Sequence, residues 1–190
     1  MGSKVQNIVL GALTVCLISL TIIYARLTQK LDINANSNSK SSTWNIHFEN
    51  LNSSVIGKAK LSSNNQLTIM NNSTTISGSV GNLYLPGDSI IYTFDIVNSG
   101  TISAVLSVSP TISVPECSSL DITSSNNVCS NVEYTLTYAD GTKIKPGDFL
   151  DKGEKKAAKL TLSLKEEMSS VPSEDVDITN IAATLFYSQK

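Results

Sequence analysis

Apolar side chains recur at every second position through most of this chain. Ile90, Tyr92, Phe94 and Ile96 form one such row. Side chains at alternate positions of a strand point to the same face, so this row is predicted to face a hydrophobic core. The same pattern predicts strands at residues 44–48, 66–70, 89–97, 101–109, 132–139, 157–164 and 181–188.

Residues that favour turns separate these predicted strands. They are Pro86-Gly87-Asp88, Asn98-Ser99-Gly100, Asp140-Gly141 and Pro146-Gly147-Asp148. At Asn98-Ser99-Gly100 the chain is expected to reverse. A second inward row is then expected from Ile102, Ala104, Leu106 and Val108.

Helical periodicity is scarce. Residues 164–172 could hold one short helical turn, which Pro172 would end. Short strands separated by turns predict an all-β fold, an antiparallel β-sandwich of the jelly-roll or immunoglobulin-like type. The sandwich is assigned to residues 44–190, a length that can bury a complete core.

An apolar segment precedes this body. Residues 8–25 lie between Lys4 and Arg26 and contain no charged side chain. A helix of this length spans about 27 Å, close to the thickness of a bilayer core. Residues 1–25 are therefore predicted to be a signal peptide cleaved after Ala25 or, alternatively, a retained membrane anchor. Either way the body is expected outside the cytoplasm, with membrane contact only through residues 1–25.

The segment from 26 to 43 is predicted to be a strand followed by a polar spacer. Leu27, Leu31, Ile33 and Ala35 fall on one face of residues 27–35, with polar residues on the other. Such a strand can be the first strand of its own sandwich. It can also be donated to the open sheet edge of a neighbouring copy, where backbone hydrogen bonds would hold it.

Three cysteines are present, and two of them suit a disulfide. Cys16 lies in the apolar segment, whereas Cys117 and Cys129 are twelve positions apart in a polar stretch predicted to be a loop. In an exported protein these two can form a disulfide that contributes roughly 3 kcal/mol. Two free thiols, or a metal pair without further ligands, are the alternatives.

Candidate catalytic chemistry is absent from the sequence pattern. His47 is the only histidine, and the chain contains neither G-x-S-x-G nor H-E-x-x-H. Residues 174–177 and the pair Asp148 and Asp151 lack the spacing of a defined calcium loop. A net charge of −2 argues against nucleic-acid binding. No catalytic residue, metal or cofactor is therefore predicted, and the chain is not expected to be an enzyme.

Several stretches together resemble the TasA/camelysin family of exported bacterial surface and biofilm-matrix proteins. In order they are "IYARLTQKLDINA", "TWNIHFENL", "YLPGDSIIYTFDIVNSGTISA", "YTLTYADGTKIKPGDFLDKGEKKAAKLTLSL" and "ITNIAATLFYSQK". The resemblance implies a jelly-roll sandwich that is released by a dedicated signal peptidase and assembles into extracellular fibres. In such fibres an N-terminal segment of one subunit completes the sheet of the next. This shorter chain is expected to lack the helical insertions of larger members, and no motif here supports the metalloprotease label attached to camelysin.

The expected function is that of a subunit of surface or biofilm-matrix fibres, polymerising through its N-terminal strand. Its expected partners are other copies of itself, a signal peptidase and an accessory matrix subunit. Two alternatives belong to other classes. One is a membrane-tethered, monomeric immunoglobulin-like module that binds or adheres through loops such as residues 117–129. The other is a secreted hydrolase, for which the sequence offers no catalytic group.

Overall fold

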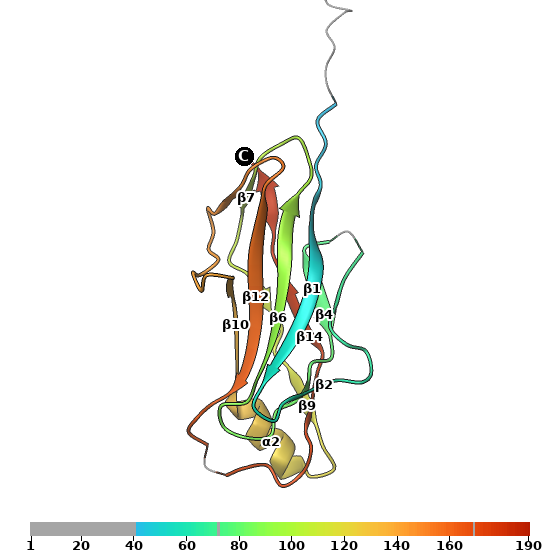
Figure 1. The fold of residues 1–190 in the computed structure, drawn as a ribbon, viewed down its shortest axis with the longest axis vertical. Coiled ribbons are helices and arrows are strands. Elements are labelled where there is room, and N and C mark those ends of the chain that lie inside the picture. Colours follow the sequence, from blue (N-terminus) through green and yellow to red (C-terminus); the bar gives the residue numbers. More distant parts are fainter. Residues whose placement is uncertain (1–40, 72, 169) are drawn as a thin grey trace, which may run out of the picture. The chain divides into compact units, whose positions relative to one another are not determined.

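The computed structural model describes residues 41–71, 73–168 and 170–190 (Figure 1). Residues 42–190 pack into one unit. The predicted signal or anchor, the cleavage position after Ala25 and the strand at residues 27–35 lie outside the described residues. Within the described part, no helix is both long and apolar enough to cross a membrane.

The largest sheet has four antiparallel strands in the order β1-β6-β12-β10. Their bounds are Ile46–Ile56 for β1, Ser89–Asn98 for β6, Lys155–Leu164 for β12 and Val132–Tyr138 for β10. In Figure 1, β1 and β10 form the two sides of this sheet. Both are therefore edge strands.

Each of three smaller antiparallel sheets contains one strand from the C-terminal stretch, residues 177–189. The first has the order β2-β5-β13-β9, with bounds Lys60–Leu61, Gly81–Asn82, Asp177–Thr179 and Glu116–Ser118. The second has the order β3-β4-β14-β8, with bounds Thr68–Ile69, Thr75–Gly78, Ile181–Thr184 and Thr111–Ile112. The third has the order β11-β7-β15, with bounds Phe149–Leu150, Ala104–Leu106 and Tyr187–Gln189.

A single hydrophobic core lies between the β1-β6-β12-β10 sheet and the three smaller sheets. The predicted row of β6 is buried, and Leu160 and Leu162 of β12 lie in the same cluster. Ile76, Ile178 and Ile181 enter it from the smaller sheets. The predicted all-β, antiparallel, sandwich-like class is therefore confirmed.

The turn after β6 does not make a hairpin, contrary to the expectation that two adjacent rows meet there. β6 pairs with β1 and β12, whereas β7 pairs with β11 and β15. Asn98 is buried, and its side chain donates to the carbonyl oxygens of Ile102 (2.9 Å) and Leu150 (3.1 Å). These bonds direct the chain from one sheet into the other. The second row is also shorter than predicted, because Val108 is 47% exposed.

One helix, α2 (Ile122–Asn131), occupies the stretch predicted to be a polar loop. The side chain of Asp121 caps it by accepting hydrogen bonds from the backbone N–H groups of Thr123 and Ser124. This helix departs from the expectation of a chain without helical insertions. The predicted helical turn at residues 164–172 is wrong for the residues described there, because Leu164 ends β12 by pairing with Val132.

The two Pro-Gly-Asp sequences form the same kind of turn. Gly87 and Gly147 have φ angles of 84° and 90°, the region that the third residue of a type II turn requires. In each turn the aspartate N–H donates to the carbonyl of the residue before proline. Asp88 also accepts from the backbone N–H groups of Lys58 (2.8 Å), Tyr84 (2.9 Å) and Leu85 (2.8 Å). Its carboxylate thereby joins the turn to the segment that follows β1.

Candidate functional site

His47, the one residue on which a catalytic triad would have to depend, sits in a structural setting. Its Nε2 lies 3.7 Å from Glu49 Oε1, and its Nδ1 lies 3.1 Å from Asn45 Oδ1. Neither neighbour is a nucleophile. Within residues 41–71, 73–168 and 170–190, no group of three or more His, Cys, Asp or Glu side chains could hold a metal ion.

The acidic residues weighed as calcium ligands are engaged in local hydrogen bonds. Asp148 accepts from the Tyr138 hydroxyl (3.0 Å) and from the Lys145 N–H (2.9 Å) within its turn. Asp177 accepts from the Asn82 amide (2.9 Å), and Asp175 from the Tyr84 hydroxyl (3.4 Å). The carboxylates of Asp148, Asp175 and Asp177 are thus each hydrogen-bonded to a donor of the protein.

Cys117 and Cys129 form the predicted disulfide, with their Cα atoms 5.8 Å apart. Cys117 lies in β9 and Cys129 in α2, so the bond ties the helix to an edge strand of one small sheet. Only Val128, Ser124 and Ser125 of the helix are buried. A helix with so small a buried face depends on its cap and on the disulfide for its position.

Removing the disulfide is expected to lower the free energy of unfolding by about 3 kcal/mol, because the unfolded chain regains the freedom that the closed loop denies it. The double variant Cys117→Ser/Cys129→Ser tests this by chemical denaturation followed by circular dichroism. Reduction of the unchanged protein should give the same loss. Equal stability with and without the bond would contradict the prediction.

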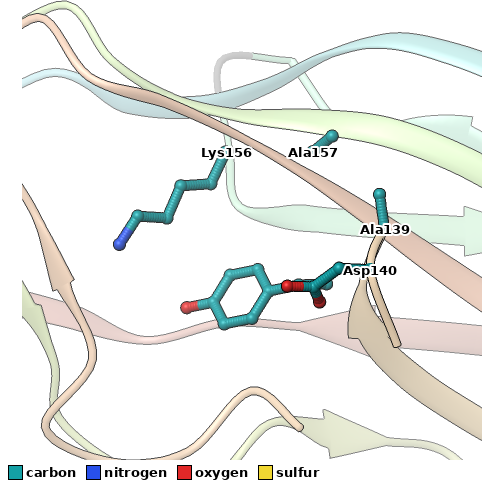
Figure 2. Close-up of a pocket in the computed structure, with 5 residues that line it drawn as sticks. Ala139, Asp140, Lys156 and Ala157 are labelled. Atoms are coloured by element: carbon teal, nitrogen blue, oxygen red, sulfur yellow. The ribbon is translucent and has the colours of Figure 1, made fainter. Parts of the chain in front are cut away.

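A shallow cavity of about 410 Å³ lies where β10 ends and its turn begins, and Figure 2 shows its lining. The Lys156 side chain extends away from Ala157, Ala139 and Asp140. The Lys156 ammonium lies 5.8 Å from the centre of the Tyr138 ring and 3.5 Å from Glu154 Oε1. Burial and the hydrogen bond to Asp148 both raise the pKa of Tyr138. The phenol of Tyr138 therefore stays protonated at neutral pH.

In the β1-β6-β12-β10 sheet, the edge formed by β1 is irregular. Its register shifts between Glu49 and Asn52, and Asn50 has a φ of 58°. Before the bulge, the Phe48 N–H faces away from β6 and donates to the carbonyl of Ser73 (3.0 Å). Beyond the bulge, the pairing places the backbone groups of Ser53 and Val55 on the outer side.

The β10 edge is regular along its whole length. Every residue from Val132 to Tyr138 pairs with β12 in one unbroken register. Hydrogen bonds join Asn131 to Lys165 and Ala139 to Ala157, so the odd-numbered residues of β10 bond to β12. The even-numbered residues therefore direct their backbone groups away from β12, and at the end of the strand that outer side is already paired with the chain's own residues, because Thr137 and Lys143 form an isolated antiparallel bridge.

The entry of the chain into β1 is held in place by backbone hydrogen bonds. The Thr101 N–H donates to the Thr43 carbonyl (2.9 Å), and the Ser99 N–H donates to the Asn45 carbonyl (3.0 Å). A side chain at Gly100 would collide with this segment, because its Cβ would lie 2.5 Å from the Thr43 carbonyl oxygen. Whatever precedes residue 43 is thus joined to the body at a defined point.

The disulfide and the apolar rows follow from the sequence, whereas the sheet edges do not, because they depend on which strands become neighbours. The predicted donor-strand residues Leu27, Leu31, Ile33 and Ala35 lie outside the described residues. No protein-family profile, curated protein or solved structure matches this chain. The resemblance to the TasA/camelysin family accordingly stays a prediction.

Proposed function

We propose that this protein is an exported structural subunit that polymerises into surface or matrix fibres by donating residues 27–35 of one copy to an open sheet edge of the next. Its body would belong to the jelly-roll or immunoglobulin-like sandwiches. The observation that carries the proposal is the β1-β6-β12-β10 sheet, whose two outer strands, β1 and β10, border a hydrophobic core that the body completes by itself. A strand can add to such an edge without any part of the body having to unfold.

The composition of residues 27–35 suits this role. One face of the predicted strand carries four apolar side chains interrupted by Gln29 and can extend a core, while the other face is polar. Burial of Leu27, Leu31 and Ile33 would contribute on the order of 5 kcal/mol, in addition to the backbone hydrogen bonds of the added strand. Repeated from copy to copy, this head-to-tail contact generates a filament and not a closed dimer.

The disulfide supports export. Disulfides persist in oxidising compartments outside the cytoplasm, and this one joins two residues of the folded body. An apolar N-terminal segment cleaved after Ala25 would deliver the body there and release residues 27–35 at the new N-terminus. A signal peptidase, and an accessory matrix subunit in the finished fibre, are the further proposed partners.

Electron microscopy of two purified proteins tests the function. A chain that begins at Arg26 is expected to form fibres, and a chain that begins at Asn36 is expected to stay dispersed. Both contain every described residue of the body, so a difference between them is due to residues 26–35. Dispersed particles from both, with full-length protein retained in the membrane fraction of cells, would favour the tethered binding module instead.

A further inference from the structure

We propose that the outer face of the β2-β5-β13-β9 sheet binds a neutral oligosaccharide, in a polar cavity that this face forms with the loop at residues 62–65. The inference concerns a ligand site and does not depend on the proposed polymerisation. The cavity measures about 490 Å³, within the range of about 300–1,000 Å³ that small-molecule sites occupy. Among the described residues that line it, only Leu61 is wholly apolar.

A row of three polar side chains crosses the sheet beneath the cavity. Lys60 of β2 pairs with Asn82 of β5, and Asn82 pairs with Asp177 of β13. Directly paired residues share a face of the sheet. The neighbouring Ile178 is fully buried in the core, so this row faces outward. The Asn82 amide donates to Asp177 Oδ1 (2.9 Å), which orients both groups, and the carboxylate retains lone pairs that can accept from a ligand hydroxyl.

Tyr84 and Asp175 extend this polar lining. The Tyr84 hydroxyl donates to Asp175 Oδ2 (3.4 Å), and the Lys60 ammonium lies 5.2 Å from the centre of the Tyr84 ring. The ring thus holds a cation and a carboxylate in the same cavity. Because the ring is half-buried, it also offers apolar surface against which the C–H groups of a sugar can pack.

The loop that forms one wall is fixed to the sheet by backbone hydrogen bonds. The Ser62 N–H donates to the Val80 carbonyl (3.0 Å), and the Ser79 N–H donates to the Asn65 carbonyl (2.7 Å). The exposed side chains of Asn64 and Asn65 add amide groups to the lining, each with donors and an acceptor. A ligand that binds here therefore has little backbone to order, which lowers the cost of binding.

The mixture of charges selects the class of ligand. Asp175 and Asp177 would repel a phosphate or a sulfate, and the ammonium of Lys60 would repel a metal cation. Each hydroxyl of a saccharide can both donate and accept a hydrogen bond. Adjacent hydroxyls can therefore bond to a carboxylate and to an amide or an ammonium at the same time. A neutral oligosaccharide matches this lining better than a ligand dominated by one charge.

A titration followed by ¹H–¹⁵N NMR tests the site in the chain that begins at Asn36, because residues 42–190 form one compact unit with its own core. The probes are three neutral tetrasaccharides: maltotetraose, cellotetraose and tetraacetylchitotetraose. At least one is expected to shift the amide signals of residues 62–65 and of Asp177 in a saturable manner.

Three variants locate the binding. Asp177→Asn replaces a charged acceptor with an amide and should weaken binding about tenfold or more. Asn64→Ala removes an amide from the exposed loop, outside the strand pairing, and should weaken binding about fivefold. Asp151→Asn makes the same chemical change as Asp177→Asn at an exposed position outside the cavity, and should leave the affinity unchanged.

Several results would overturn the assignment. These are the absence of saturable shifts with all three tetrasaccharides at their highest soluble concentrations, shifts confined to other surfaces, and equal weakening by Asp151→Asn. Shifts of the same signals with calcium chloride or sodium phosphate, but with none of the saccharides, would make the cavity an ion site and also overturn it. Fibre formation is measured separately by electron microscopy, so none of these results bears on the proposed function.

Discussion

The chain that begins at Arg26 and carries Leu31→Lys is expected to stay dispersed under conditions in which the unchanged chain forms fibres. The substitution removes a leucine from the middle of the apolar row and replaces it with an ammonium group. The contact between two subunits loses the free energy of burying the leucine side chain. It must also either remove water from the lysine ammonium group or move this group out of the interface. A loss of about 4 kcal/mol at each joint weakens subunit affinity by about a thousandfold.

A matched control is available within the same segment. Asn34→Lys adds the same charge to the polar row, so this variant is expected to form fibres as the unchanged chain does. The circular dichroism of the Leu31→Lys monomer should match that of the unchanged monomer, because the hydrophobic core of the body is built from residues 46–187. Fibres that survive Leu31→Lys would remove the donor-strand proposal.

Asp88→Ala is expected to have the largest effect on stability, lowering the free energy of unfolding by about 4 kcal/mol. Asp88 is 3% exposed and accepts backbone hydrogen bonds from Lys58, Tyr84 and Leu85. Its removal leaves three backbone donors without their acceptor, two of them in the turn before β6. The measurement is denaturant unfolding at neutral pH.

Asp148→Ala provides the comparison, because the same Pro-Gly-Asp turn occurs there in a more exposed setting. Asp148 is half-buried and accepts from one backbone N–H and the Tyr138 hydroxyl. Its loss is expected to be about half as large. Equal losses in the two variants would show that the contacts of Asp88 to the segment after β1 contribute nothing.

Asp88 also predicts how stability changes with pH. Burial acts to raise the pKa of this carboxyl, but the backbone N–H groups of Lys58, Leu85 and Tyr84 outweigh burial and hold its pKa below the ordinary value of 3.8. A pKa that is lower in the folded state means stability that is present above pH 3.8 and lost as the pH falls through the folded pKa. The unchanged protein should therefore lose more stability than Asp88→Ala between neutral pH and pH 3.

The helix shows where sequence reasoning failed. Residues 122–131 contain serine, threonine and asparagine at most positions, and their apolar residues do not recur with helical spacing. The helix is held by the Asp121 cap and by a disulfide to β9, the short strand that directly precedes it in the chain. A cap residue followed by polar residues was the only local signal, and such signals are also common in turns.

The sequence by itself located the long strands β1, β6, β10 and β12, the Pro-Gly-Asp turns and the two cysteines that pair, but not short strands such as β2, β5 and β13. These features are local: alternation decides which side chains share a face, and Pro-Gly-Asp decides where the chain bends. The tertiary structure alone decided that β6 and β7 belong to different sheets and that β1 and β10 are the outer strands of the β1-β6-β12-β10 sheet. Strand neighbours are selected by packing between distant segments, so no stretch of sequence contains that choice. For the same reason, the alternation of residues 27–35 predicts a strand from the sequence alone, whereas an edge that could receive this strand can be recognised only in the folded body.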